Sequence, residues 1–250
     1  MTIALRDRGA EAVLLDIEGT TTPIAFVQEV LFPFARRHLR DYLNEQGESP
    51  ALRQLIEQFH AEHAIDAAAG TAPPRWRNAT RADWIDSTDA YARWLMDRDR
   101  KSPALKQLQG WIWERGYRDG KLHGDVFPDT ARAIRRWRAA GLDVAIYSSG
   151  SVLAQKLLFA TTPDGDLTSS IQAFFDTAVG AKSARDSYAR IAQELNRPAP
   201  TIVFVSDVSA ELTAARSAGL QVILSIRAGN PPQPDAEQFD AIHSLDELVP

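Results

Sequence analysis

Short runs of consecutive apolar residues recur along the chain, and each is followed by polar residues or glycine. The first run, Ala12–Leu15, contains no polar residue and ends at Asp16. Such a run is typical of a strand that is buried on both faces of a parallel sheet. We expect further strands in four segments of the same character: 144–147, 201–205, 221–226 and, with a weaker pattern, 241–243.

Segments with apolar residues at helical spacing separate these expected strands. They predict helices at 131–140, 151–160, 183–196 and 209–218. Gly141 and Gly219 follow two of these helices directly, as C-terminal caps often do. Short apolar strands that alternate with helices of about ten residues are typical of βαβ units. The pattern therefore predicts an α/β protein with a Rossmann-like parallel sheet.

The segment 23–120 differs from the rest, because it shows no clear strand pattern. Five of the six tryptophans, Trp76, Trp84, Trp94, Trp111 and Trp113, lie there. Its apolar residues fall on helical faces in two sets: Phe26, Val30, Leu31 and Phe34, with a kink at Pro33, and Leu52, Leu55, Ile56 and Phe59. We expect residues 23–120 to form a helical domain inserted after the first strand, and residues 1–22 and 121–250 to form the core.

Composition narrows the function classes. The chain has 250 residues, of which 44% are hydrophobic, and a net charge of −5. An acidic balance disfavours a general role on nucleic acids or anionic membranes. The absence of cysteine excludes disulfides, thiolate metal sites and cysteine nucleophiles. Because the sequence has no apolar stretch of ~18 residues and no apolar core near Met1, we expect a soluble cytoplasmic protein.

Polar side chains follow the expected strands where the carboxyl ends of a parallel sheet would meet. An unpaired carboxylate is very costly inside a buried strand, but it is tolerated just beyond the strand, where parallel sheets bind their ligands. The candidate residues are Asp16 and Glu18 after the first strand, Ser148 and Ser149 after the second, Lys182 at a helix start, and Asp207 with Glu211 after the strand at 201–205.

These residue types suit phosphoryl transfer. An aspartate can attack phosphorus and form an aspartyl-phosphate, and carboxylate oxygens from two strands suit Mg²⁺. A hydroxyl group and backbone N–H groups at a helix start can hold a phosphate group. A second carboxylate can protonate the leaving oxygen and then deprotonate the attacking water.

The same residues carry a family resemblance. Their order resembles the haloacid dehalogenase superfamily of aspartyl-phosphate phosphatases, and several motifs resemble one branch, the enolase-phosphatases (acireductone synthases) of methionine salvage. The motifs are DIEGTTTPIAFV at 16–27, ALKQLQG at 104–110, YSSGSV at 147–152, AQKLLF at 154–159 and RAGN at 227–230. The match extends from about residue 12 to the C-terminus.

The resemblance implies a haloacid dehalogenase-like core with a helical cap, one Mg²⁺ per subunit and a monomer. It implies a small phosphate ester as substrate, 2,3-diketo-5-methylthiopentyl-1-phosphate, which is enolised and then dephosphorylated. Asp16 would be the nucleophile and a Mg²⁺ ligand together with Asp207, and Glu18 would bind Mg²⁺ through its backbone carbonyl and transfer protons. Ser148 and Ser149 would hold the phosphate group, and Lys182 would neutralise it. Apolar residues of the cap could enclose the tail of the substrate.

Two positions depart from the wider superfamily pattern. Glu18 stands where most members have aspartate, and enolase-phosphatases characteristically have glutamate there. Asp207 is followed by Val208 instead of a second acidic residue. Glu211 could take that second acidic place, either as an outer-shell metal ligand or as an anchor for the lysine, or it could be a solvated helix residue. The base that enolises the substrate is also open, with Glu18 as the first candidate.

Other interpretations compete with this one. The nearest is another small-molecule phosphatase of the same superfamily. A signalling receiver also uses acidic residues, Mg²⁺, a hydroxyl group and a lysine, but it is about half this length and its phosphorylated aspartate is not on the first strand. A purely structural protein would leave the polar strand ends without purpose. His60 and His63 have the spacing of a metal pair on a helix, but no third ligand is evident.

Overall fold

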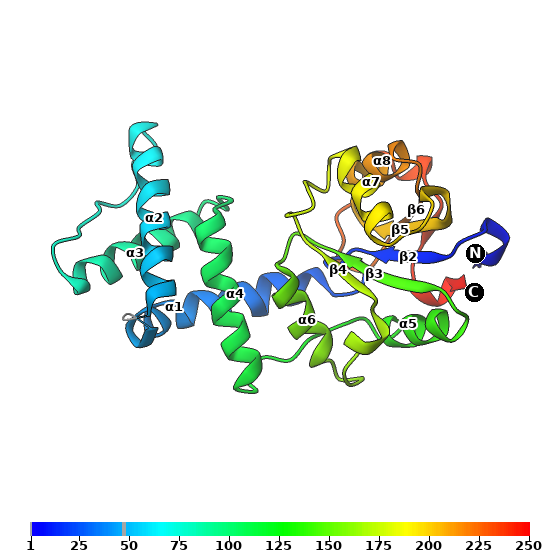
Figure 1. Cartoon of the computed structure of the whole chain (residues 1–250), viewed down its shortest axis with the longest axis horizontal. Coiled ribbons are helices and arrows are strands. Elements are labelled where there is room, and N and C mark those ends of the chain that lie inside the picture. Colours follow the sequence, from blue (N-terminus) through cyan, green and yellow to red (C-terminus); the bar gives the residue numbers. More distant parts are fainter. Residues whose placement is uncertain (1, 47–48) are drawn as a thin grey trace. The chain divides into compact units, whose positions relative to one another are not determined.

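The computed structural model describes residues 2–46 and 49–250 and divides the chain into two compact units (Figure 1). The first unit comprises Met1–Gln28 and Gly120–Pro250, and the second comprises Glu29–Asp119. We call them the sheet unit and the helical unit. Residues 23–28, which the sequence pattern assigned to the helical insert, fall in the sheet unit. Each unit is described by itself below.

A six-stranded parallel sheet forms the centre of the sheet unit, with strand order β4-β3-β2-β5-β6-β7. Its strands are β2 (Ala12–Leu15), β3 (Asp143–Tyr147), β4 (Ala173–Phe175), β5 (Ile202–Ser206), β6 (Gln221–Ser225) and β7 (Ala241–Ile242). The α/β class with a parallel sheet is therefore confirmed, and five of the strands overlap the segments that the apolar runs predicted. The sequence analysis missed β4, because this edge strand has only three residues and only Phe175 is fully buried.

The register of the sheet aligns the ends of its central strands. Leu15 of β2 pairs with Ile146 of β3 on one side and with Val205 of β5 on the other. Because all three strands run in the same direction, the residues that follow them emerge at one edge of the sheet. Asp16 therefore lies between Tyr147 and Ser206 across strands spaced by about 4.8 Å.

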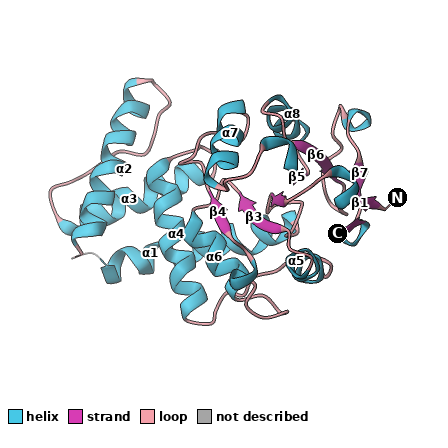
Figure 2. Cartoon of the chain, turned by 45° about the vertical axis from the view of Figure 1, so that its right-hand side comes forward, coloured by secondary structure: helices cyan, strands magenta, loops and turns pink. Residues whose placement is uncertain are grey.

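Helices pack against the sheet between successive strands (Figure 2). They are α5 (Thr130–Ala139), α6 (Val152–Ala160), α7 (Arg185–Glu194) and α8 (Ser209–Ser217), with short 3-10 turns at Arg6–Arg8, Thr168–Ser170, Ala199–Thr201, Ala236–Gln238 and Leu245–Glu247. The prediction that Lys182 begins a helix is wrong. Because α7 begins at Arg185, Lys182 lies in the preceding loop.

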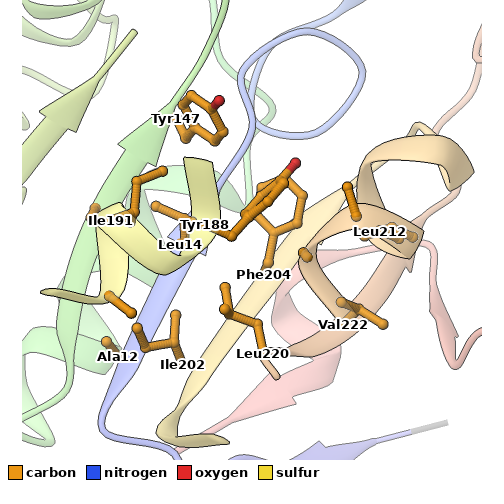
Figure 3. Close-up of a cluster of buried hydrophobic side chains, with 14 of the residues drawn as sticks. Ala12, Leu14, Tyr147, Tyr188, Ile191, Ile202, Phe204, Leu212, Leu220 and Val222 are labelled. Atoms are coloured by element: carbon orange, nitrogen blue, oxygen red, sulfur yellow. The ribbon is translucent and has the colours of Figure 1, made fainter. Parts of the chain in front are cut away.

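An apolar cluster joins the sheet to α7 and α8 (Figure 3). Leu14, Tyr147 and Phe204 from three neighbouring strands meet Tyr188 and Ile191 from α7. The two tyrosine rings pack edge to face, with centroids 5.5 Å apart. Burial of such side chains contributes roughly 1.5–3 kcal/mol each, so the cluster fixes α7 on the sheet.

Segments from both ends of the sequence form a second, two-stranded sheet. β1 (Ile3–Ala4) pairs in parallel with β8 (Leu248–Val249). The indole N–H of Trp137 on α5 donates a hydrogen bond of 2.9 Å to the carbonyl of Leu248. Two-residue strands are too short to show an apolar pattern, and the sequence analysis did not predict them.

The helical unit is built from four α-helices after a π-helix at Phe26–Leu31. They are α1 (Phe32–Gln46), α2 (Pro50–Ala68), α3 (Arg81–Met96) and α4 (Pro103–Arg118). Ser49, Thr80 and Ser102 cap α2, α3 and α4 through their side chains. Pro33 lies in the first turn of α1, where a missing N–H is tolerated, so the expected kink inside a helix is replaced by a change of helix type. No helix in the described parts of the chain is both long enough and apolar enough to cross a membrane.

Candidate active site at the sheet edge

Asp16 is the first residue after β2, and it is only 4% exposed. Its backbone N–H extends the sheet by donating to the carbonyl of Val205. Its Oδ1 accepts a hydrogen bond of 2.7 Å from the N–H of Ile17. The aspartate is therefore held at the sheet edge by the strand before it and the turn after it.

Lys182 lies between two carboxylates. Its Nζ is 2.6 Å from Oδ1 of Asp16 and 2.6 Å from Oε2 of Glu211. Burial alone would lower the pKa of this ammonium group, but the two negative charges outweigh burial and raise its pKa above the usual value. The lysine thus keeps a positive charge beside Asp16.

Ser206 links the same two carboxylates from the end of β5. Its hydroxyl group is 3.0 Å from Oε2 of Glu211 and 3.4 Å from Oδ2 of Asp16. Burial and the charge of Asp16 raise the pKa of Glu211, and Lys182 opposes them. Of the roles that the sequence left open for Glu211, these contacts favour the lysine anchor. The sequence analysis missed Ser206, because a serine at the end of a strand gives no distinctive signal.

Asp207 lies opposite the turn that follows Asp16. It is 6% exposed, and burial together with the charges of Asp16 and Glu211 raises its pKa to about 7, although Lys182 opposes the shift. Gly19 has a φ of +70°, and a Cβ atom placed there would lie 2.3 Å from Oδ2 of Asp207. Only glycine therefore lets the turn approach the carboxylate so closely.

The turn after β3 leads to the start of α6 at Val152 and is held by several hydrogen bonds. The N–H of Ser148 donates to the carbonyl of Phe175, and the N–H of Gly150 donates to the hydroxyl oxygen of Ser148 over 3.3 Å. Ser148 is buried, whereas Ser149 is exposed. The side chain of Gln155 donates to the carbonyls of Gly150 and Phe175, each over 2.8 Å. Strand register places this turn beside the end of β2, where Asp16 lies.

Residues that are distant in the sequence hold the turn at 19–22 by hydrogen bonds, and we call these contacts the clamp. The guanidinium group of Arg227 donates to the carbonyl of Thr20 and forms an ion pair with Asp129, whose Oδ2 lies 2.7 Å away. Burial alone would raise the pKa of Asp129, but hydrogen bonds from Arg227, Ser244 and the backbone lower it. The sequence analysis noted RAGN only as a motif and gave Asp129 no role.

Asn230 holds the same turn from the other side. Its Nδ2 donates to the carbonyls of Gly19 and Ser225, over 2.9 and 3.3 Å. Its Oδ1 is buried and, within the described chain, has no hydrogen-bond partner. This oxygen and the carboxylate of Asp207 both lie beside Gly19, on the side where any other residue would carry its Cβ atom.

The oxygen atoms around Asp16 fit a hard divalent cation. In the described residues, no group of three or more histidine, cysteine, aspartate or glutamate side chains is arranged to hold a metal. The expected donors differ from such a group, because they are two carboxylates, of Asp16 and Asp207, and the backbone carbonyl of Glu18. Burial and the charge of Asp16 raise the pKa of the Asp207 carboxylate, so a cation beside these two carboxylates would be stabilising, and oxygen donors suit Mg²⁺.

His60 and His63 of α2 both contact aromatic rings in the helical unit. The ring of His60 stacks on Trp76, with centroids 5.0 Å apart. A ring nitrogen of His63, Nε2, lies 2.7 Å from the carbonyl oxygen of Pro74, and the ring packs edge to face on Tyr91. Both histidines thus take part in aromatic packing of α2, His60 against the loop that follows it and His63 against α3.

Comparison with known proteins gives one family. The haloacid dehalogenase-like hydrolases match residues 10–219. Enolase-phosphatase E1 of Synechococcus elongatus is 46% identical over 236 residues, which cover 94% of this chain and 96% of that protein. Enolase-phosphatase E1 of Drosophila persimilis is 43% identical, over 96% of this chain and 97% of that protein.

A solved structure extends the similarity to the fold. The UTR4 protein of Saccharomyces cerevisiae is 33% identical and superimposes with a TM-score of 0.75. The alignment covers 94% of this chain and 98% of the yeast protein. The similarity therefore includes the helical unit as well as the sheet unit.

Proposed function

This chain belongs to the haloacid dehalogenase-like hydrolases and, within them, to the enolase-phosphatases, and we propose that Asp16 is its catalytic nucleophile. The proposed substrate is 2,3-diketo-5-methylthiopentyl-1-phosphate, which the enzyme enolises and then dephosphorylates to the acireductone in methionine salvage. The observation that carries the proposal is the contact of Lys182 with the buried Asp16 and with the partly buried Glu211, each at 2.6 Å.

In the first phosphoryl step, a carboxylate oxygen of Asp16 attacks phosphorus and the bond from phosphorus to the ester oxygen breaks. Lys182 stabilises the negative charge on the phosphoryl oxygens, because it lies beside the nucleophile. Ser148 and the backbone N–H of Ser149 hold the phosphate group at the start of α6. Glu18 donates a proton to the departing oxygen.

In the second step, Glu18 accepts a proton from water, which attacks phosphorus. The bond between phosphorus and the Asp16 oxygen breaks, so inorganic phosphate leaves and the Asp16 carboxylate is regenerated. Glu211 takes no part in bond changes. It keeps Lys182 in place and is itself oriented by Ser206.

Asp16, Asp207 and the backbone carbonyl of Glu18 would hold one Mg²⁺ per chain. When bound, Mg²⁺ supplies a Lewis acid that offsets negative charge on the phosphoryl group and on an enolate. The remaining expectations from the resemblance, a cap role for residues 23–120 and a cytoplasmic monomer, stay predictions.

One assay tests the proposed function. Incubation of the protein with the diketo phosphate ester and Mg²⁺ is expected to give an ultraviolet absorbance of the enol and a stoichiometric release of phosphate. Addition of EDTA is expected to stop phosphate release, and Mg²⁺ is expected to restore it. Faster phosphate release from sugar phosphates than from the diketo ester would contradict the substrate and favour another phosphatase of the superfamily.

A second prediction separates the two chemical steps. In Glu18→Gln the side chain keeps its length but cannot accept a proton, so we expect both enolisation and phosphate release to fall by about 10²–10⁴-fold. Stopped-flow absorbance reports enolisation, and a phosphate assay reports hydrolysis. If enolisation continues at the wild-type rate while phosphate release stops, Glu18 is not the enolisation base.

A further inference from the structure

Two parts of Lys182 have to be held in place, the ammonium group of the side chain and the backbone. The ion pairs with Asp16 and Glu211 fix the Nζ atom. The backbone of residues 180–182, however, lies outside any helix or strand, and its backbone hydrogen bonds are those of turns: the N–H of Gly180 donates to the carbonyl of Thr177, and the N–H of Ala184 donates to the carbonyl of Ala181. A lysine has a flexible four-carbon stem, and a loose backbone would move its charge.

Three side-chain hydroxyl groups donate to three successive carbonyls of this loop. Tyr147 donates to Gly180 over 3.0 Å, Ser187 donates to Ala181 over 2.7 Å, and Tyr188 donates to Lys182 over 2.7 Å. Each carbonyl from residue 180 to residue 182 thus has its own donor. We refer to these three groups as the hydroxyl triad.

The hydroxyl triad is anchored in rigid elements. Tyr147 is the last residue of β3, and Ser187 and Tyr188 lie in the first turn of α7. All three are buried, and the two tyrosine rings belong to the apolar cluster, from which their hydroxyl oxygens point outward (Figure 3). Burial raises the pKa of both tyrosines, so both hydroxyl groups keep their protons and remain donors at neutral pH.

The loop also approaches the triad closely. Gly180 has a φ of +138°, and a Cβ atom there would lie 2.2 Å from the hydroxyl oxygen of Ser187. The ring of Tyr147 lies 5.8 Å from Nζ of Lys182, so the same tyrosine contacts both the backbone and the charge. The loop at 180–182, the end of β3 and the start of α7 therefore pack closely against one another.

We propose that the hydroxyl triad of Tyr147, Ser187 and Tyr188 positions Lys182 for phosphoryl transfer. The proposal rests on the proposed function, since it assumes that Lys182 contacts a transferred phosphoryl group. The triad is needed most while Asp16 carries the phosphoryl group. At that stage Asp16 no longer offers Lys182 a carboxylate charge, and Glu211 and the loop must hold the lysine so that its ammonium group faces the phosphoryl oxygens. The triad residues are positioning residues and do not touch the substrate.

Phenylalanine variants test the proposal, because they remove the hydroxyl groups and keep the buried rings. We expect Tyr188→Phe to lower kcat by about 10-fold and Tyr147→Phe/Tyr188→Phe by about 100-fold, with KM changed by less than about threefold. Inhibition by vanadate, which mimics the five-coordinate phosphoryl group, is expected to weaken in parallel with kcat. If the double variant does not fold, Ser187→Ala takes its place. We expect it too to lower kcat while KM changes little.

Tyr91→Phe is the matched control. The hydroxyl group of Tyr91 is also buried and donates over 2.7 Å to Asp66, but it belongs to the helical unit and supports no proposed site residue. The Tyr91→Phe variant should lose as much thermal stability as Tyr188→Phe. Its kcat and its inhibition by vanadate should remain those of the wild type. The proposal is overturned if kcat of Tyr147→Phe/Tyr188→Phe is within about twofold of that of Tyr91→Phe. It is also overturned if the triad substitutions change Tm and leave kcat unchanged.

The choice of substrate keeps this proposal separate from the proposed function. All variants are assayed with both the diketo ester and p-nitrophenyl phosphate, in the presence of Mg²⁺. If the wild type hydrolyses only p-nitrophenyl phosphate, the proposed substrate is wrong, and the variants still decide the role of the triad. If the wild type is active on both and the triad variants match it, the positioning role alone fails.

Discussion

Asp16→Asn is expected to abolish phosphate release, with a loss of at least about 10⁴-fold in kcat. The amide has nearly the same shape as the carboxylate, but it is a poor nucleophile, so no aspartyl-phosphate can form. Lys182 still has Glu211 as a partner at 2.6 Å, and the site should remain folded. A phosphate assay under single-turnover conditions, together with thermal unfolding, measures both expectations.

The control for this substitution is Asp186→Asn on α7. Asp186 has a largely exposed side chain at 76% and, within the described residues, pairs with the neighbouring Arg185 over 3.4 Å. It should retain wild-type activity. Asp16→Asn with more than about a tenth of wild-type phosphate release would exclude Asp16 as the nucleophile, whatever its effect on metal binding.

Gly19→Ala is expected to cause a large loss of activity, although the substitution adds only one methyl group. The Cβ atom would lie 2.3 Å from Oδ2 of Asp207, so the carboxylate or the turn must move. The left-handed backbone adds a strain of about 1–2 kcal/mol. Because a displacement of about 1 Å at a reacting site can cost about 100-fold in rate, we expect kcat/KM to fall by at least that factor.

Gly141→Ala provides a control with the same backbone strain. Gly141 has a φ of +86°, but a Cβ atom there would meet nothing within 4 Å. Both variants should therefore lose thermal stability, whereas only Gly19→Ala should lose activity and weaken Mg²⁺ binding, measured by titration calorimetry. Equal activity of the two variants would show that close packing between Gly19 and Asp207 does not matter for function.

The sheet was predictable because its strands are buried on both faces. Runs such as Ala12–Leu15 and residues 202–205 contain no polar residue, so their apolar pattern is continuous. The expected helices follow from spacing and caps. In contrast, β4 and the pair β1–β8 depend on neighbours that are distant in the sequence, and two or three residues are too few for a local signal.

Part of the candidate site was predictable, because the proposed chemistry requires particular residue types. Asp16, Lys182 and Asp207 stand at strand ends or in a loop beside them, and the sheet brings the first two into contact. The roles of Ser206, Asn230 and Asp129 could not be predicted, because serine, asparagine and aspartate are common in turns for other reasons. Their contacts depend on the register of β5 and on the path of the chain after β6, which only the folded structure defines.

The clamp on residues 19–22 has a consequence for how the chain folds. Arg227 reaches Thr20 across 207 positions of sequence and Asp129 across 98. Contacts of such long range form slowly, because chain closure costs conformational entropy before the contact is made. During synthesis from the N-terminus, the turn beside Asp16 would have to wait for the last tenth of the chain. A nascent chain would therefore acquire the central strands of its sheet before the turn beside Asp16 is fixed.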